Sequence, residues 1–298
     1  MNFKIITFFV ILSLVTIIPV ADAQITITDN AEQKSVEVII SSTGDVHVKH
    51  VVNPLIIPKQ VELIYGTVSN ITVTNENGEK KQFSVIGENE SVLLHPSQEN
   101  LVLEYDLQHV ISQKDGIWTW SFRYLETTSF ILPEEIEIVF ANERPIQMND
   151  KKGITCHGCQ MILEYSIEEP KIFESVMWED KKFLVEISSH SDIDKFIFDQ
   201  PSKSITFEVL EENRFVTVVI PLELLWEPYM VFLDDEKIFF HEYINNGTHV
   251  WVNMKPDMSG EITIIGTTVV PEFSMMIPLI MGFLVILTLP FMKRFSLH

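Results

Sequence analysis

The only two cysteines of this chain lie three residues apart, in the segment Cys-His-Gly-Cys at positions 156–159. Outside the cytoplasm such a pair forms a local disulfide, because oxidising compartments bond thiols that have no other partner. Alternatively, the thiolates of Cys156 and Cys159, with His157 and the thioether of Met161, would form a soft site for Cu(I). Redox exchange or an inter-chain bond is the third interpretation. All three place the chain's best candidate site here.

Other chemistries lack their motifs. A c-type haem needs His directly after the second cysteine, and Gln160 stands there. A structural zinc would need a fourth ligand and a second pair of cysteines. No Gly-rich phosphate loop, HExxH or GxSxG motif occurs in the sequence. We therefore predict no catalytic residue and no enzyme, although a triad built from residues distant in sequence would leave no motif.

Two further residue pairs have types that can bind a metal ion or a sugar, but we predict structural roles for both. His47 and His50 are three apart on an expected strand, so they point to opposite faces and cannot chelate one ion there. We predict that both are surface residues. Trp118 and Trp120 share one face of an expected strand, and we predict that they belong to the core rather than to a sugar-binding platform.

The C-terminal segment predicts a membrane span. Residues 275–292 contain no charged side chain and, at about 1.5 Å per residue in a helix, can cross a hydrocarbon core of about 30 Å. Lys293 and Arg294 follow directly, and basic flanks stay on the cytoplasmic side. We therefore expect a cytoplasmic C-terminus and an extracytoplasmic ectodomain in the cell membrane.

The N-terminal segment predicts a signal peptide over residues 1–23. Lys4 supplies the positive region, residues 5–20 are apolar, and Ala21-Asp22-Ala23 has the small-x-small pattern of a cleavage site. The mature chain would begin at Gln24. An uncleaved N-terminal anchor is the alternative, and it leaves the same part of the chain outside.

Three residues before the expected span form a motif. Pro271, Glu272 and Phe273, followed by the apolar stretch and a basic end, resemble the PEF-CTERM class of archaeal sorting signals. The resemblance implies that a membrane-embedded transpeptidase, an archaeosortase, cuts near the motif and moves the ectodomain to another anchor. Ser274 departs from the Gly or Pro often found after this motif. In the alternative, Pro271 ends the last strand before an ordinary anchor helix.

The net charge narrows the choice of partners. The chain has 42 acidic and 21 basic side chains, and 41 and 18 of them lie between the two apolar ends. A formal charge of about −23 on this part repels phosphates, so we expect no nucleic-acid binding. A solvated acidic surface is the plainer interpretation, and an acidic docking patch for cations or basic proteins is the alternative.

The pattern of apolar residues predicts an all-β fold. Period-two alternation recurs in short runs such as Asp45–Lys49, Asn100–Tyr105 and Ser204–Val209, and Asp115-Gly116 suits a tight turn. We predict two tandem Ig-like β-sandwich domains, residues 24–169 and 170–268, before a tail of residues 269–298. Residues 204–273 also resemble a β-sandwich module of archaeal exported proteins, which implies architecture and no catalytic residue.

Three N-glycosylation sequons begin at Asn70, Asn89 and Asn246, in stretches that we interpret as turns or strand ends. We expect a membrane-anchored cell-surface protein with a structural, adhesive or recognition role and with cell-envelope proteins as partners. The alternatives are an extracytoplasmic copper or redox accessory protein, for which copper is the only cofactor implied, and a surface hydrolase without a recognisable motif.

Overall fold

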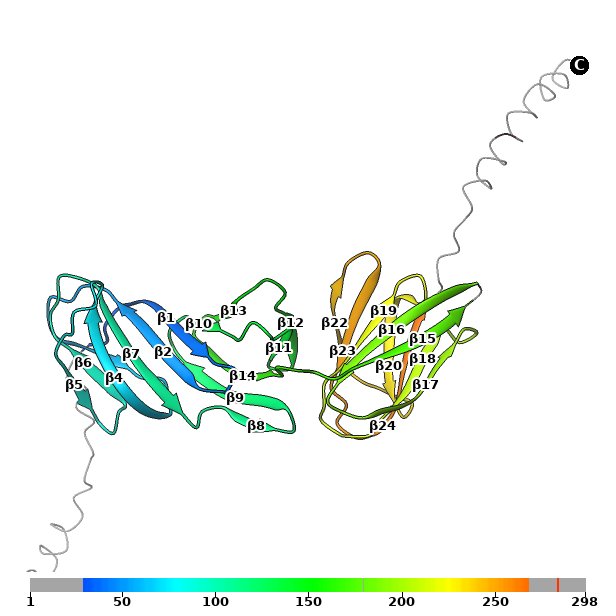
Figure 1. Ribbon diagram of the computed structural model, residues 1–298, viewed down its shortest axis with the longest axis horizontal. Helices are drawn as coiled ribbons and strands as arrows, with labels where there is room; N and C mark the ends of the chain where they lie inside the picture. Colours follow the sequence, from blue (N-terminus) through cyan, green and yellow to red (C-terminus); the bar gives the residue numbers. More distant parts are fainter. Residues whose placement is uncertain (1–28, 179, 268–282, 284–298) are drawn as a thin grey trace, which may run out of the picture. The chain divides into compact units, whose positions relative to one another are not determined.

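The protein is all-β in the part that the computed structural model describes, which comprises residues 29–178, 180–267 and 283 (Figure 1). Residues 29–178 and 180–267 form 24 strands and no helix, which confirms the prediction of an all-β protein. In the described residues no helix is long and apolar enough to span a membrane. The predicted signal peptide, the motif Pro271-Glu272-Phe273 and the rest of the predicted tail, except residue 283, lie outside the described residues.

The strands form because apolar and polar residues alternate along them. In β2 (Val46–Val52) and β7 (Leu101–Gln108) every second side chain is buried, as expected for strands with one face on a core. Asp115 and Gly116 connect β8 (Ser112–Lys114) to β9 (Ile117–Tyr124) with φ angles of 50° and 82°. Two successive positive φ angles are typical of a type I′ hairpin turn, so the predicted tight turn is confirmed.

The chain divides into two compact units. The smaller one contains the described residues up to Ser35 together with Lys49–Tyr65 and Asn70–Glu104, and the larger one contains Val36–Val48, Gly66–Ser69 and the described residues from Tyr105. Strands β1 (Gln33–Ile40), β2, β4 (Thr67–Asn75) and β7 contribute residues to both units.

The first fourteen strands form three sheets. Their orders are β13-β10-β1-β2-β7-β4, β12-β11-β14-β9-β8 and β3-β6-β5. Of the pairings described in them, β1 with β10 is parallel, and the others are antiparallel. Besides β2, β7, β8 and β9, these three sheets contain β1 (Gln33–Ile40), β3 (Lys59–Glu62), β4 (Thr67–Asn75), β5 (Phe83–Ile86), β6 (Ser91–Leu94), β10 (Thr128–Ile131), β11 (Ile138–Ala141), β12 (Arg144–Gln147), β13 (Gly153–Cys156) and β14 (Cys159–Tyr165).

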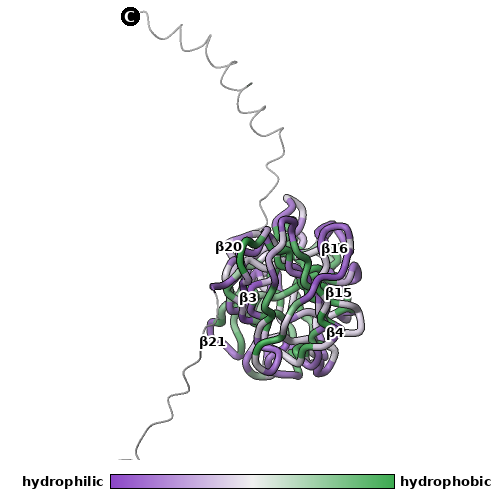
Figure 2. Tube along the Cα trace, turned by 90° about the vertical axis from the view of Figure 1, so that its left-hand side faces the viewer, coloured by the Kyte–Doolittle hydropathy of each residue, from purple (hydrophilic) through white to green (hydrophobic). Residues whose placement is uncertain are grey.

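The last ten strands form two five-stranded sheets, here called the C-terminal sandwich (residues 171–267). Their orders are β15-β16-β19-β23-β22 and β17-β18-β24-β20-β21. One continuous core lies between them, with fully buried residues such as Ile187, Phe207 and Val252. Hydrophobic stretches lie toward the interior in Figure 2, and hydrophilic ones toward the outer loops. The strands are β15 (Lys171–Trp178), β16 (Lys181–Ser189), β17 (Ile193–Asp199), β18 (Ser204–Val209), β19 (Val216–Pro221), β20 (Trp226–Leu233), β21 (Glu236–Lys237), β22 (Phe240–Asn245), β23 (His249–Met254) and β24 (Gly260–Thr267).

Candidate functional site

The segment 156–159 forms a corner between two sheets. Cys156 ends β13, where it pairs with Thr128 of β10, and Cys159 begins β14, where it pairs with Tyr124 of β9. The two cysteines are bonded to each other across this corner, with their Cα atoms 5.8 Å apart. The predicted disulfide is therefore present, and the backbone turns sharply enough to allow it.

A second crossover lies against the first. The chain passes from β9 to β10 through residues 125–127, so two of the connections between these two sheets lie next to each other here. Gly158 has a φ of 52°, and a Cβ there would lie 2.9 Å from the carbonyl oxygen of Leu125. At Gly153 a Cβ would lie 1.8 Å from the carbonyl oxygen of Phe130. Gly158 therefore supplies the left-handed conformation, whereas Gly153 allows two backbones to approach.

The residues predicted to bind Cu(I) do not form an open ligand set in this structure. The sulfur atoms of Cys156 and Cys159 are bonded to each other, so neither is a thiolate. His157 is exposed, and its Nδ1 lies 3.2 Å from Oγ1 of Thr127, whereas Met161 is buried. Within the described residues no group of three or more His, Cys, Asp or Glu side chains has metal-binding geometry. Metal binding here would first require reduction of the disulfide.

The three sequon asparagines are all exposed. Asn89 and Asn246 lie in turns, as predicted. Asn70 lies inside β4 rather than at a turn or strand end, and its φ of 56° interrupts the regular strand geometry there. At Asn246 the side-chain Oδ1 accepts hydrogen bonds from the amide and the hydroxyl of Thr248, at 3.0 and 2.9 Å.

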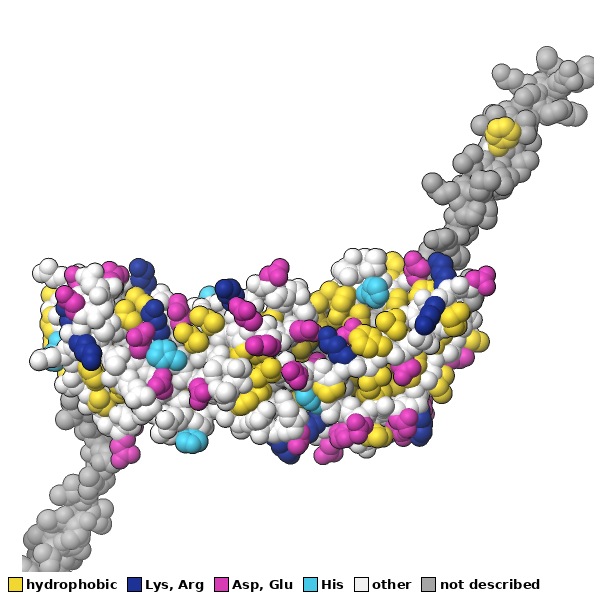
Figure 3. Space-filling model, in the orientation of Figure 1, with side chains coloured by type: hydrophobic (Ala, Val, Ile, Leu, Met, Phe, Trp, Pro, Cys, Tyr) yellow, Lys and Arg dark blue, Asp and Glu magenta, His cyan; other side chains and the backbone are white. Residues whose placement is uncertain are grey.

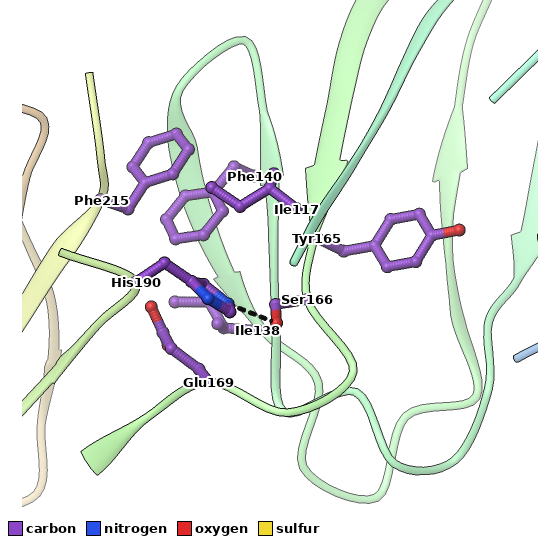
Figure 4. A pocket seen from close by; sticks show the side chains of 8 residues that line it. All are labelled: Ile117, Ile138, Phe140, Tyr165, Ser166, Glu169, His190 and Phe215. Atoms are coloured by element: carbon purple, nitrogen blue, oxygen red, sulfur yellow. Dashed lines mark hydrogen bonds between the residues drawn. The ribbon is translucent and has the colours of Figure 1, made fainter. Parts of the chain in front are cut away.

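A second candidate site, which we call the His190 cavity, lies in the larger unit (Figure 4). The Nε2 atom of His190 lies 2.7 Å from Oγ of Ser166, and the carboxylate of Glu169 lies beside the same ring. These polar groups and several apolar side chains line a cavity of about 10 Å³. The lining residues are Ile117, Ile138, Phe140, Tyr165, Ser166, Glu169, His190 and Phe215.

The surroundings shift the pKa values of both titratable side chains in this cavity. Burial, helped by the nearby Arg214, lowers the pKa of His190, so its imidazole is neutral near pH 7. Burial raises the pKa of Glu169 to about 7, with further increases from Glu137 and Glu186 and an opposing effect from Lys171. A neutral imidazole next to a hydroxyl is the arrangement in which a serine can transfer its proton to a histidine.

The size of the cavity limits what this pair can do. About 10 Å³ admits roughly one water molecule, which leaves no room for a substrate group beside Ser166. Tyr165 directs its hydroxyl away from the cavity (Figure 4), and that buried oxygen has no hydrogen-bond partner among the described residues. Burial raises the pKa of Tyr165 to about 12. We therefore assign Ser166 and His190 a structural role, in which each satisfies a partly buried polar group of the other.

Apolar and ionic contacts fix the wall of the His190 cavity. The rings of Phe140 and Phe215 stack with centroids 3.6 Å apart, and Nζ of Lys255 lies 4.5 Å from the centroid of Phe215. The same ammonium forms an ion pair with Glu164 at 3.2 Å. Arg214 pairs at 2.6 Å with Asp115, a residue of the turn whose Gly116 packs on His190. These contacts join β11, β14 and the turn before β9 to the C-terminal sandwich.

The prediction that His50 is a surface residue is wrong. His50 is fully buried rather than exposed, and its Nδ1 lies 2.6 Å from Oε1 of Gln33. Burial lowers the pKa of His50 to about 3, so Nδ1 carries a proton and donates to the amide oxygen while the ring stays neutral. His47 lies on the opposite face of β2, as predicted, and contacts Asp106 at 2.7 Å.

Comparison with known proteins assigns no family, because no family model matches the chain and no curated protein is significantly similar to it in sequence. The function is therefore inferred from the residues themselves. The sequence indicates the corner at 156–159 but not the His190 cavity. Ser166 and His190 are 24 residues apart and follow different strands, so no local pattern connects them.

Proposed function

We propose that this chain is a membrane-anchored cell-surface protein with a structural, adhesive or recognition role and no catalytic activity. The observation that carries the proposal is the disulfide between Cys156 and Cys159 at an exposed corner of an all-β protein. Such bonds persist in oxidising, extracytoplasmic compartments and are rare in the cytosol. The exposed sequon asparagines and the excess of acidic side chains over the surface (Figure 3) are consistent with export.

The proposed architecture is two Ig-like sandwich domains in tandem, residues 24–169 and 170–268. The C-terminal sandwich supports this division, because its core involves only residues 176–264. Its first, second and fifth strands, β15, β16 and β19, are neighbours in one sheet, as are the corresponding strands of an immunoglobulin domain. For the first domain the support is the alternation of its strands over residues 33–165.

The proposed anchoring uses both ends of the chain. Residues 1–23 direct export, residues 275–292 span the membrane, and Lys293 and Arg294 hold the C-terminus in the cytoplasm. An archaeosortase would then act at Pro271-Glu272-Phe273, on the outer side of the span.

Protease accessibility on intact cells tests the location. Proteinase K added outside should degrade the β-rich part, whereas a cytosolic marker protein stays intact. N-terminal sequencing of the purified protein should give Gln24 as the first residue. If the chain is protected from the protease and retains Met1, the proposed location is wrong.

Substitution of Glu272 tests the processing step. If the motif is a cleavage site, Glu272→Ala should convert the shorter mature form into a longer form that retains the tail. Glu236→Ala, which changes an exposed glutamate of β21, is the matched control and should leave processing unchanged. An intact tail through His298 in the wild-type protein, measured by mass spectrometry, would show that the span is a plain anchor.

A further inference from the structure

The edge strands of the sheets differ in how well they are protected against pairing. An edge strand exposes unpaired backbone amides and carbonyls, and proteins usually shorten, bend or cover it. Among the described sheets, six edge strands (β3, β5, β8, β12, β13 and β21) have four residues or fewer. The edges β17 and β22 contain register shifts, and β4 contains Asn70 in a left-handed conformation.

The remaining edge strand, β15, has none of these protections. Its eight residues pair without interruption with β16, from Lys171 opposite Ser188 to Trp178 opposite Lys181. It contains no Pro, no Gly and no residue with positive φ. The backbone groups on its outer side are therefore arranged regularly enough to continue the sheet.

Apolar side chains surround this open edge on the outer face of the sheet. Phe173 and Met177 of β15 are 54% and 65% exposed, and Leu184 of β16 is 50% exposed. Leu184 pairs with Ser175, so the three side chains surround the middle of the edge. Figure 3 shows hydrophobic side chains over the region of β15 and β16. Large exposed apolar side chains gathered at one place are typical of interaction surfaces.

The sequence of β15 fits a second copy of itself. In an antiparallel pair of two β15 strands centred on Ser175, Phe173 of one copy lies opposite Met177 of the other. Aromatic rings and thioethers make favourable contacts, and the two serines are small enough for close approach at the centre. The side chains of Phe173 and Met177 from both copies then enclose the two serines.

The charges near the edge suit the same register. Glu186 is the β16 partner of Phe173, and Lys182 is the β16 partner of Met177. In the register centred on Ser175, Glu186 and Phe173 of one copy therefore line up with Met177 and Lys182 of the other. This row of four side chains occurs twice, and each row has a glutamate at one end and a lysine at the other. No like charges face each other in either row. A register centred on Phe173 or on Met177 would instead place two glutamates or two lysines at the ends of one row, so centring on Ser175 is the alignment that avoids like charges there.

We propose that β15 is a homodimerisation edge, which pairs antiparallel with β15 of a second copy and joins two five-stranded sheets into one. Two short strands and their flanking side chains bury less than the roughly 800 Å² per partner of a standard interface, so we expect a weak dimer with a Kd on the order of 10 µM. The net charge of −21 opposes association at long range, so the dimer should be tighter at high salt.

Sedimentation of the full-length protein in a mild detergent, at about 1 to 100 µM and at low and high salt, measures the association. The double variant Phe173→Glu with Met177→Glu should be monomeric, because it places carboxylates opposite each other. The variant Phe173→Lys with Met177→Lys should also be monomeric, because it places two ammonium groups opposite each other. A mixture of the two variants should recover the dimer at a Kd within about tenfold of the wild type, since each lysine then faces a glutamate.

Cross-linking tests the register. Under mild oxidation Ser175→Cys should form a disulfide-linked dimer, because hydrogen-bonded antiparallel pairs place Cα atoms about 5.5 Å apart. Ser112→Cys, on the exposed edge strand β8, is the matched control and should stay uncross-linked. A wild-type chain that stays monomeric throughout the range, charge variants that dimerise as the wild type does, or equal cross-linking of both cysteine variants would each overturn the proposal.

Discussion

Substitution of His50 should change how stability depends on pH. The pKa of His50 is about 3 in the folded chain and 6.5 when the imidazole is solvated. Between these values the unfolded chain binds a proton at His50 and the folded chain does not, so this residue lowers the free energy of unfolding as pH falls from 6.5 toward 3. At about 1.36 kcal/mol per pH unit, the loss between pH 7.5 and pH 5 is about 2 kcal/mol.

The measurement is the difference in free energy of unfolding between wild type and His50→Asn, from urea titrations followed by tryptophan fluorescence at pH 5, 6 and 7.5. The wild type should lose about 2 kcal/mol relative to the variant between pH 7.5 and pH 5. His50→Leu is the matched control. It differs from His50→Asn in packing and in the bond to Gln33, so its absolute stability differs, but its pH dependence should be parallel to that of His50→Asn.

Taking a difference is necessary because other groups titrate in the same range. Glu169, whose pKa is raised to about 7, stabilises the folded chain as pH falls from 7 to 4.5, which is opposite in sign to His50. Subtracting the variant removes this contribution. A difference between wild type and both variants that stays constant from pH 7.5 to pH 5 would refute the burial of an uncharged imidazole at His50.

Three further substitutions test the corner and the cavity. Gly153→Ala should cost at least about 3 kcal/mol in the free energy of unfolding, because the new methyl group meets the carbonyl oxygen of Phe130, and urea titration measures it. Changing Cys156 and Cys159 together to Ser should cost only about 2 kcal/mol by the same assay, because the ring closed by the disulfide is short. Glu169→Gln should raise the melting temperature at pH 8 but not at pH 5, since only the ionised carboxylate is poorly solvated; equal shifts at both pH values would contradict the raised pKa.

The strands could be predicted where local pattern and tertiary burial agree. The alternating runs at Asp45–Lys49 and Asn100–Tyr105 belong to β2 and β7 apart from the first residue of each run, because one face of each strand is buried. The short apolar run Ile238–Phe240 also has the composition of a strand, but it contains the break between β21 and β22. These two strands belong to different sheets, so the chain must leave one ladder there before it joins the other.

The burial of His50 was predictable from a signal that its residue type concealed. His50 is in phase with Val46, Val48 and Val52, which are all buried on the same face of β2. Alternation therefore placed it inside, and Gln33 satisfies Nδ1 there. The His190 cavity had no such signal, since its polar residues follow strands of different sheets and meet only after the chain has folded.

The location of the disulfide is better explained by sheet geometry than by chain entropy. Cys156 and Cys159 lie at the ends of strands from two sheets, where the ladder hydrogen bonds of β13 and β14 stop. The adjacent crossover at residues 125–127 is a second break in the same two ladders. Because backbone pairing ends at both crossovers, the bond holds together a corner that hydrogen bonds do not secure. Its loss should therefore increase amide exchange first at residues 125–128 and 156–159, and uniform acceleration through β9 and β14 would indicate a global role instead.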